Sequence, residues 1–272
     1  MSELSVVTLV GADDEPLHDL VASLYAQTRR PDELVVAHLE PRPPRVRHGA
    51  IPVRVVHVAG VPPRRALARN EAALLARGPA LVFIDPSCQP TPTAIAAFCA
   101  ALEAADAVFL GDVLDPPAGR RSPAPTPAAS RPSIVTSRCD YADFDAASFA
   151  IRRATYGRLG GMDPRFAGFG GDAEDFAASL ELHGVPLFRL AAACAFRRRA
   201  APLDPLRHFD DIIRNAWTYY RKWGQWPMRE WLDQFAAAGY VSLDADDLKV
   251  HRTPTPEELR ATHRSIRTRG PR

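Results

Sequence analysis

The sequence predicts an α/β fold with a mostly parallel sheet, and two observations lead to that prediction. Short apolar runs rich in β-branched residues recur along the first half of the chain, beginning with LSVVTLV at 4–10. Between them lie segments of about 10 to 15 residues whose apolar side chains repeat at helical spacing. Strands that alternate with helices in this way form βαβ units, in which consecutive strands lie parallel.

Each element of this half follows from its own pattern. Leu17, Leu20 and Leu24 lie on one face of a helix, so the first helix is expected over 17–27. A later helix is expected to end at Gly78, because glycine favours helix termination. The expected strands are 4–10, 33–39, 52–58, 80–85 and 106–114, and the expected helices are 17–27, 64–78 and one that opens at Pro90–Pro92.

The second half of the core domain contains a strand, a short helix and a Gly-Gly stop over 147–166. A glycine-rich turn, an acid-rich helix and another strand follow over 168–190. Before them, segment 116–132 holds six prolines and almost no large apolar side chain. We expect this segment to be either a lid over a site or a plain surface insertion. The core domain is therefore expected at 1–203.

A helical extension that packs on the core is expected at 204–272. Helical patterns run over 208–224 and 228–239, with a turn at Trp226-Pro227 between them. The aromatic residues of this part either pack it on the core or form a platform for a sugar. A last short helix is expected after Thr255, because Thr255, Pro256 and Glu258 have the spacing of an N-cap, a first-turn proline and a capping box.

Composition limits the classes of function. The chain has 272 residues, of which 46% are hydrophobic and 24% charged, enough for one large α/β domain with a tail. A formal net charge of +2 gives no reason to expect nucleic acid as a partner. The sequence shows no signal peptide and no transmembrane segment, so the expected location is the cytoplasm. Four widely spaced cysteines form no CxxC pair and are expected to be free thiols.

Asp85 stands where a buried strand ends, in the segment VFIDPSCQP at 82–90. In an open α/β sheet, ligands bind beyond the carboxyl ends of the strands, so an acid at this place is a candidate for ligand binding. The alternative is that Asp85 caps the following turn. Arg69 and Asn70 lie on the helix before this strand, and taken alone such a pair belongs to an exposed helix surface.

The longest recognisable pattern is SFAIRRATYGRLGGMDPRFAGFGGDAEDFAASLELHGVPL at 148–187. It resembles the family 2 glycosyltransferases of GT-A type, in which an xxRRxxxxxxGGFDxxF segment precedes a GxGGEDxDF turn and a helix. The positions in register are Gly160, Gly161, Asp163, Phe166, Gly168, Gly170, Gly171, Asp175, Phe176, Leu180 and Gly184. The resemblance implies a Rossmann-like GT-A fold and transfer of a sugar, with inversion, from a nucleoside-diphosphate sugar of UDP or GDP type.

The same resemblance implies which residues bind the donor and a metal ion. Arg69 and Asn70 match the Arg-Asn pair that contacts the diphosphate and nucleoside, and Val10 is placed in the same donor site. Asp85 and Ser87 occupy the Asp-x-Asp motif that binds ribose and a divalent cation, Mg²⁺ or Mn²⁺. Serine replaces the second acid, which weakens the expected metal site. His208 matches a histidine that completes such a site, or is simply a surface or core residue.

Three acids are candidates for the general base on the acceptor side. Without a gap in the alignment, the expected Glu-Asp pair becomes Asp172-Ala173, and alanine stands where the base is expected. A shift of two residues supplies Glu174-Asp175 instead. Asp175 is favoured because both alignments make it acidic. The alternative is that these carboxylates only stabilise the N-terminal dipole of the helix.

The loss of an acid from each motif leaves other functions open. One is a transferase whose acceptor needs little help from a base, such as a thiol. Another is a nucleotide-sugar-binding or interaction protein without catalysis on the same fold. The acceptor class is a sugar, a natural product or a glycan, and a homodimer is compatible with the sequence.

Overall fold

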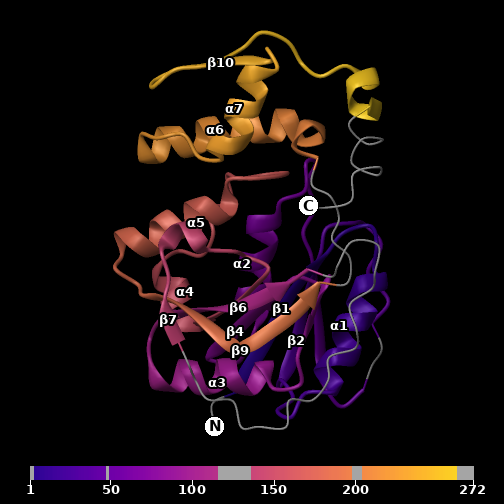
Figure 1. Cartoon of the computed structure of the whole chain (residues 1–272). Coiled ribbons are helices and arrows are strands. Elements are labelled where there is room, and N and C mark those ends of the chain that lie inside the picture. The colour runs from indigo at the N-terminus through magenta and orange to yellow at the C-terminus, as the bar shows by residue number, and fades with distance from the viewer. Residues whose placement is uncertain (1–2, 47–48, 116–135, 198–203, 262–272) are drawn as a thin grey trace.

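The β-branched runs form the centre of a nine-stranded sheet, as seen in a computed structural model that describes residues 3–46, 49–115, 136–197 and 204–261 (Figure 1). The strands follow one another in space in the order β3-β2-β1-β4-β8-β6-β9-β5, and β7 pairs with β9. The strands are β1 (Leu4–Val10), β2 (Glu33–His38), β3 (Val53–His57), β4 (Ala80–Ile84), β5 (Cys88–Pro90), β6 (Val108–Leu114), β7 (Thr136–Arg138), β8 (Ser148–Arg152) and β9 (Leu187–Arg197).

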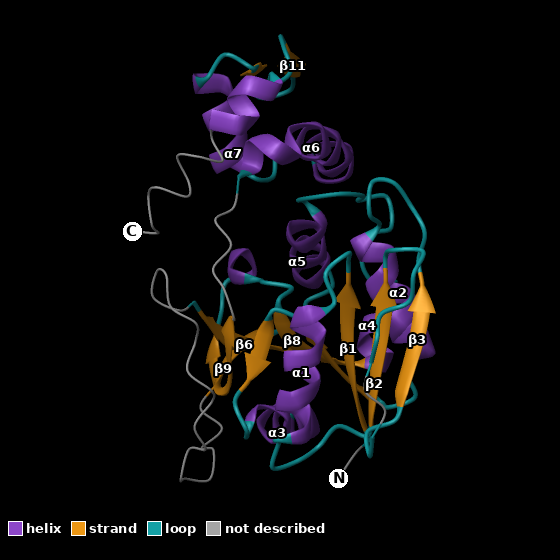
Figure 2. Ribbon diagram, turned by 90° about the vertical axis from the view of Figure 1, so that its right-hand side faces the viewer, coloured by secondary structure: helices purple, strands orange, loops and turns teal. Residues whose placement is uncertain are grey.

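The direction of the strands fixes one edge of the sheet as the place for a site. β1, β2, β3 and β4 run parallel, so their carboxyl ends meet at one edge. β8 runs antiparallel to β4 and β6, whereas β6 and β9 are again parallel. Figures 1 and 2 show this edge facing the helices of the C-terminal part of the chain.

Helices cover both faces of the sheet, because strands such as β1 and β4 are apolar on both sides and both sides must be kept from water. One face packs on α1 (Glu15–Tyr25) and α3 (Ala94–Ala104), whose apolar residues share a core with the strands. The other packs on α2 (Arg65–Leu75), α4 (Arg153–Arg158) and α5 (Asp172–Leu182) (Figure 2). The predicted α/β class is therefore confirmed.

The C-terminal extension has its own hydrophobic core. This core includes Phe209, Trp226, Leu232 and Tyr240, and Phe169 of the preceding domain packs against it. The elements of the extension are a 3-10 turn at Pro205–His208, α6 (Phe209–Trp223), α7 (Arg229–Ala237), β10 (Val241–Leu243) and β11 (Leu248–Val250). The extension is thus not purely helical, because β10 and β11 form an antiparallel hairpin that the sequence patterns did not predict.

Some boundaries differ from the predicted ones. The helix expected over 64–78 ends at Leu75, and Ala76 is extended, before β4 begins at Ala80. The three-residue strands β5 and β7 are too short to show an alternating pattern, so they were missed. The predicted capping box is present, because Thr255 N donates to Glu258 at 2.8 Å and Glu258 N donates to Thr255 Oγ1 at 3.3 Å.

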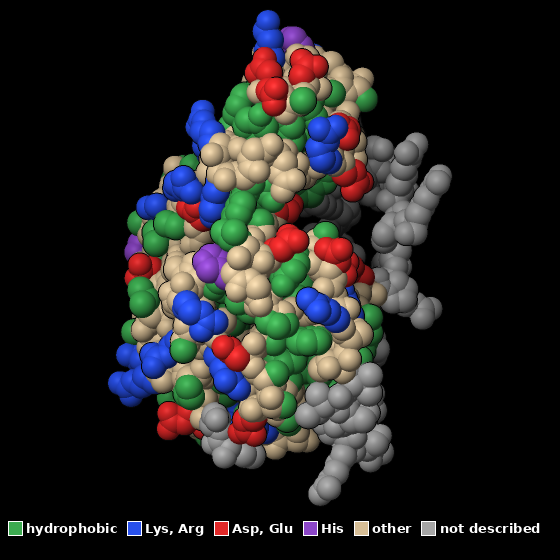
Figure 3. All heavy atoms as spheres, turned by 90° about the vertical axis from the view of Figure 1, so that its left-hand side faces the viewer, with side chains coloured by type: hydrophobic (Ala, Val, Ile, Leu, Met, Phe, Trp, Pro, Cys, Tyr) green, Lys and Arg blue, Asp and Glu red, His purple; other side chains and the backbone are tan. Residues whose placement is uncertain are grey.

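Several predictions concern the chain as a whole. The Pro-rich segment 116–132 lies outside the described residues, and so do all the residues between β9 and the extension, 198–203. Among the described residues, no helix is long and apolar enough to cross a membrane. Basic and acidic side chains are interspersed over the face of the molecule in Figure 3. Cys88, Cys99, Cys139 and Cys194 are all free, as predicted.

Candidate active site

The carboxyl ends of β1 and β2 border a polar pocket of about 450 Å³. Val10, which the sequence assigned to donor binding, lies on its wall together with Asp14, Glu40 and Arg42. Asp14 Oδ2 accepts a hydrogen bond of 3.2 Å from the backbone of Arg45, which ties the two loops of the pocket together. Small-molecule sites usually enclose about 300 to 1,000 Å³, so this pocket has room for a nucleoside.

Asp85 follows β4 directly and lies at the same edge of the sheet. Its backbone N–H donates to the carbonyl of Ala147 at 2.7 Å, which anchors it to the strand β8. Its Oδ1 accepts from the backbone N–H of Ser87 at 2.9 Å and from the Ser87 hydroxyl at 2.6 Å. Asp85 therefore does cap the following turn. No described residue donates a hydrogen bond to Oδ2, the second oxygen of this carboxylate.

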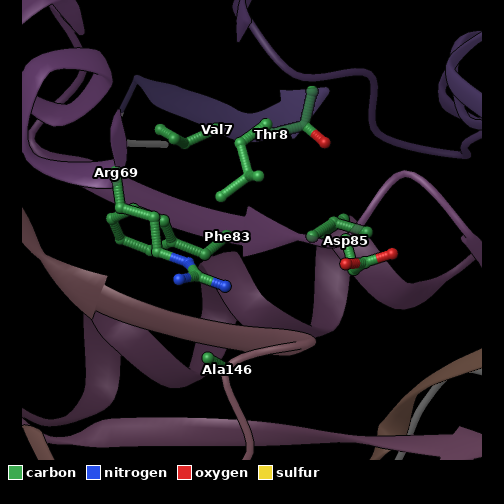
Figure 4. A pocket seen from close by; sticks show the side chains of 8 residues that line it. Val7, Thr8, Arg69, Phe83, Asp85 and Ala146 are labelled. Carbon is green, nitrogen blue, oxygen red and sulfur yellow. The ribbon is translucent and has the colours of Figure 1, made fainter. Parts of the chain in front are cut away.

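Arg69 of α2 and Asp172 of α5 form an ion pair at 3.1 Å. The Arg69 side chain also borders a small cavity, with Val7 on β1 and Asp85 beyond β4 on its other sides (Figure 4). This cavity holds about 10 Å³, which is room for about one water molecule. The structure thus brings a predicted donor residue, Arg69, together with a predicted base, Asp172, and places Asp85 across the cavity.

Asn70 has a different environment from Arg69. Its Nδ2 donates to the carbonyl of Met162 at 2.7 Å, and its Oδ1 accepts from Met162 N at 2.9 Å and Tyr156 Oη at 2.7 Å. It lines a groove of about 720 Å³ between α2 and α4, on the side of Pro79, which precedes β4. Asn70 thus fixes the Gly-Gly turn in front of Met162, and it does not line the cavity that Arg69 shares with Asp85.

Asp175, the favoured base, is 2% exposed and is enclosed by α6 of the extension. Its Oδ1 lies 2.7 Å from Lys222 Nζ and accepts a hydrogen bond of 2.8 Å from Trp223 Nε1. Burial raises the pKa of Asp175, although the hydrogen bonds and the charge of Lys222 oppose this effect. The carboxylate is thus held by two side chains from another part of the chain.

The other two acids differ in exposure and in partner. The side chain of Asp172 is 20% exposed and meets Arg69 at the sheet edge. Burial, followed by the nearby charge of Asp172, raises the pKa of Glu174. Burial is also the main cause of the raised pKa of Tyr219 on α6, to which the charges of Asp175 and Glu174 contribute. Of the three, Asp172 is the acid that contacts a donor-site candidate.

The residues predicted to hold a metal do not form a metal site by themselves. Among the described residues, no group of three or more His, Cys, Asp and Glu side chains is placed to bind a metal ion. His208 stacks on Phe169 with ring centroids 4.4 Å apart, and burial lowers its pKa. The Ser87 hydroxyl proton is used by Asp85. The donor set therefore does not fit a divalent ion held by protein ligands alone.

The three-dimensional arrangement is similar to that of known proteins. A search of family models finds no match, and a search of curated proteins finds none. Among solved structures, GalNAc-T7 with UDP, GalNAc and Mn²⁺ aligns with a TM-score of 0.56 at 16% identity, over 81% of this chain and 50% of that one. S. aureus TarS 1–349 aligns with a TM-score of 0.54 at 14% identity, over 87% of this chain and 79% of that one. The same TarS piece in complex with UDP-GlcNAc aligns with a TM-score of 0.55 at 16% identity, over 79% of this chain and 65% of that one.

The chain has the GT-A fold. It spans half the length of the GalNAc-T7 chain that it matches. The predicted Rossmann-like core is thus confirmed, and Val10 and Asp85 lie at the edge of the GT-A sheet where the sequence placed them.

Two residues near the acids of the GT-A core, Asn215 and Lys222, were not predicted, and a third, Trp223, is one of the aromatic residues expected to pack the extension on the core or to form a platform for a sugar. Asn215, Lys222 and Trp223 all belong to α6, and all contact the segment 167–175. Asn215 is 1% exposed. The sequence signal that could have identified it is an asparagine on the otherwise apolar face of a helical pattern.

Proposed function

We propose that this protein transfers a sugar, with inversion, from a nucleoside-diphosphate sugar to a hydroxyl acceptor, in the manner of the family 2 glycosyltransferases. The observation that supports this proposal most is the Arg69–Asp172 ion pair beside Asp85 at the carboxyl edge of a GT-A sheet. The pair joins a cation suited to phosphate with a carboxylate suited to an acceptor hydroxyl.

The donor lies along this edge. The nucleoside occupies the pocket next to Val10, which is large enough for it. Asp85 Oδ2 accepts a hydrogen bond from a ribose hydroxyl, because Oδ1 is taken by Ser87. Arg69 contacts Asp172 through Nη1, and its other N–H groups are directed to the diphosphate. Asn70 supports this arrangement indirectly, through the turn that ends at Met162.

Asp172 is the general base in this proposal. As the acceptor oxygen bonds to the anomeric carbon, the bond from that carbon to the diphosphate oxygen breaks, and the electron pair leaves with the diphosphate. The acceptor proton passes to the Asp172 carboxylate. Asp172 is preferred to Asp175 because Asp175 is enclosed by Lys222 and Trp223. No step uses a metal ion, since the described side chains do not complete a metal site.

Thermal unfolding with nucleotide sugars tests the binding part of the proposal. UDP-GlcNAc or a GDP-sugar at about 100 times its Kd stabilises a protein by about 2.7 kcal/mol, which raises the Tm of a chain of this size by about 5 to 10 °C. Asp85→Ala should abolish the rise. A wild-type Tm that no UDP- or GDP-sugar changes would contradict the proposal. Repeating the measurement with Mn²⁺ and with EDTA tests the predicted role of Mg²⁺ or Mn²⁺.

A second candidate function is sugar-nucleotide binding without catalysis. Ala173 favours it, because a side chain without a carboxylate stands where the base of the resembling family is expected. A raised Tm without release of UDP from UDP-GlcNAc, either to water or to sugar and thiol acceptors, would support this candidate. Release with thiols alone would indicate an acceptor that needs little help from a base.

A further inference from the structure

Helix α6 of the extension lies directly over the N-terminus of α5 and the glycine-rich turn before it (Figures 1 and 2). Asp211, Asn215 and Lys222 are spaced by four and seven residues, so they share one face of α6. That face contacts the segment 167–175, which lies within the stretch 148–187 that resembles the family. The contacts lie at both ends of the segment.

Asn215 holds the first end of this segment. Its Nδ2 lies 3.0 Å from the carbonyl oxygen of Ala167, 3.1 Å from that of Phe169 and 2.7 Å from that of Gly170. A carboxamide has two N–H bonds for these three acceptors, so at least one is shared. Asp211 Oδ2 adds a contact of 3.2 Å by accepting from Phe169 N. The turn therefore takes its shape from α6.

Lys222 and Trp223 hold the second end. Lys222 Nζ lies 2.7 Å from Asp175 and 3.3 Å from Asp163, so one cation bridges α5 and the loop after α4. Trp223 donates to the same Asp175 carboxylate. Asp172 lies between the two held ends, on the side of α5 that faces Arg69.

The glycines of the turn leave the space that the contact between the turn and the extension needs. Gly168 and Gly170 have φ values of +75° and +86°, which other residues rarely adopt. A Cβ atom on Gly168 would meet the carboxylate of Asp211, and one on Gly170 would meet the sulfur of Met228. The glycines therefore allow the turn to bend and the extension to approach it.

We propose that Asn215 and Lys222 are positioning residues, through which the C-terminal extension sets the direction of Asp172 at the sheet edge. For its catalytic part this inference rests on the proposed function. Its structural part is independent, because it concerns the conformation of residues 167–175.

Asn215→Asp is the sharpest variant, because it keeps the shape of the side chain and replaces the N–H donors with an acceptor facing three carbonyl oxygens. We expect the amides of 167–175 to exchange with deuterium at least about tenfold faster, with those of β1 and β2 unchanged. The rate of UDP release from UDP-GlcNAc should fall about 100-fold, while the Kd for UDP changes by less than about twofold. Gln234→Glu makes the same amide-to-acid change on the exposed face of α7, where it loses only a 3.5 Å hydrogen bond to Glu230, so it should leave exchange at 167–175 and UDP release unchanged.

Lys222 gives a second, milder test. Lys222→Met should accelerate exchange around Asp175 and slow UDP release, and Lys222→Arg should restore both because it keeps the cation. Arg221→Met changes the exposed residue before Lys222. The Arg221 side chain lies over the Trp217 ring and, in the described part of the chain, forms no hydrogen bond or ion pair with 167–175, so this control should change neither.

Unchanged exchange at 167–175 in both Asn215→Asp and Lys222→Met would overturn the inference. The inference would also be overturned if the variants lost UDP affinity and the rate of UDP release by the same factor, because equal losses indicate general destabilisation of the protein. If wild-type protein releases no nucleoside diphosphate from any UDP- or GDP-sugar, the proposed function fails, and the exchange measurement still decides whether α6 shapes the turn.

Discussion

Arg69 and Asp172 lie 103 positions apart in the sequence, and their side chains form a half-buried ion pair at 3.1 Å. The pair joins α2, which precedes β4, to the helix that carries the acids of the family resemblance. Each charge is neutralised in part by the other, so substitution of either residue is expected to change the behaviour of its partner as well.

A double-mutant cycle measures this coupling. Arg69→Met alone leaves the Asp172 carboxylate without its cation and should lower the free energy of unfolding by about 1 to 3 kcal/mol. The double variant Arg69→Met/Asp172→Leu should lose about 1 to 2 kcal/mol less than the sum of the losses of the two single variants. The control is Arg229 with Asp233, whose side chains are 57% and 55% exposed, and its coupling should stay below about 0.5 kcal/mol. Additive losses at Arg69 and Asp172 would show that the pair is not formed in solution.

Activity should distinguish the three acids. Asp172→Asn removes the proposed proton acceptor, so UDP release from UDP-GlcNAc should fall by about 100- to 10,000-fold, while stability falls by no more than the loss of the Arg69 ion pair accounts for. Asp175→Asn leaves Lys222 without its closest carboxylate, so it should lower the Tm and affect UDP release less. Glu174→Gln is the control for the general negative charge at the start of α5. If Asp175→Asn is inactive at an unchanged Tm, Asp175 is the base and the assignment to Asp172 is wrong.

Glycine substitutions test the fit between the core and the extension. Gly170→Ala should cost about 2 kcal/mol or more, because φ is +86° and the added methyl group meets Met228. Met228→Ala in the same chain should recover the stability lost to the clash with the Met228 sulfur. The stability lost to the positive φ of residue 170 should remain lost. Gly157→Ala is the matched control: it lies in α4 with nothing within 4 Å of the added atom, so it should stabilise by about 0.5 to 1 kcal/mol. Equal effects at the two glycines, measured by urea unfolding, would contradict the contact with the extension.

Asp163 should make stability depend on acid pH. Burial acts to raise its pKa, but hydrogen bonds from Arg165 and the charge of Lys222 outweigh burial and lower it from 3.8 to about 2. A carboxyl with a lower pKa in the folded state stabilises above its unfolded pKa, and this stability is lost as the pH falls toward about 2. Asp175 contributes with the opposite sign, since burial raises its pKa.

Urea unfolding of the wild type and of Asp163→Asn between about pH 6 and pH 2 checks this expectation. The difference in stability between the two proteins should shrink by about 1 to 2 kcal/mol as the pH falls from about 4 to 2. Curves that remain parallel over this range would show that Asp163 is not held by Arg165 and Lys222 in solution.

The parts of the structure that depend on local sequence were predictable. β-branched runs and helical spacing identified β1, β2 and β4, and the Thr255 and Glu258 pair identified the start of the last helix. The position of Asp85 at the carboxyl edge followed from the parallel order of strands, because parallel strands end on the same side.

The partners of the acids could not be predicted in the same way. Asp172 and Asp175 are three residues apart and look equivalent in the sequence, yet α2 supplies the partner of one and α6 the partner of the other. Which acid is buried depends on where α6 lies, and helical periodicity alone does not fix the packing of one helix on another. The hairpin of β10 and β11 was missed because each strand has only three residues.

The three hydrogen bonds from Asn215 to the glycine-rich turn have a consequence for the evolution of this architecture. A turn that takes its shape from a helix outside the core cannot be inherited separately from that helix. Exchange of the extension between related proteins by recombination would leave the turn without its template, so the two segments are expected to vary together among relatives. In this chain, the boundary between the core and the extension separates two parts of the sequence but does not separate two interchangeable modules.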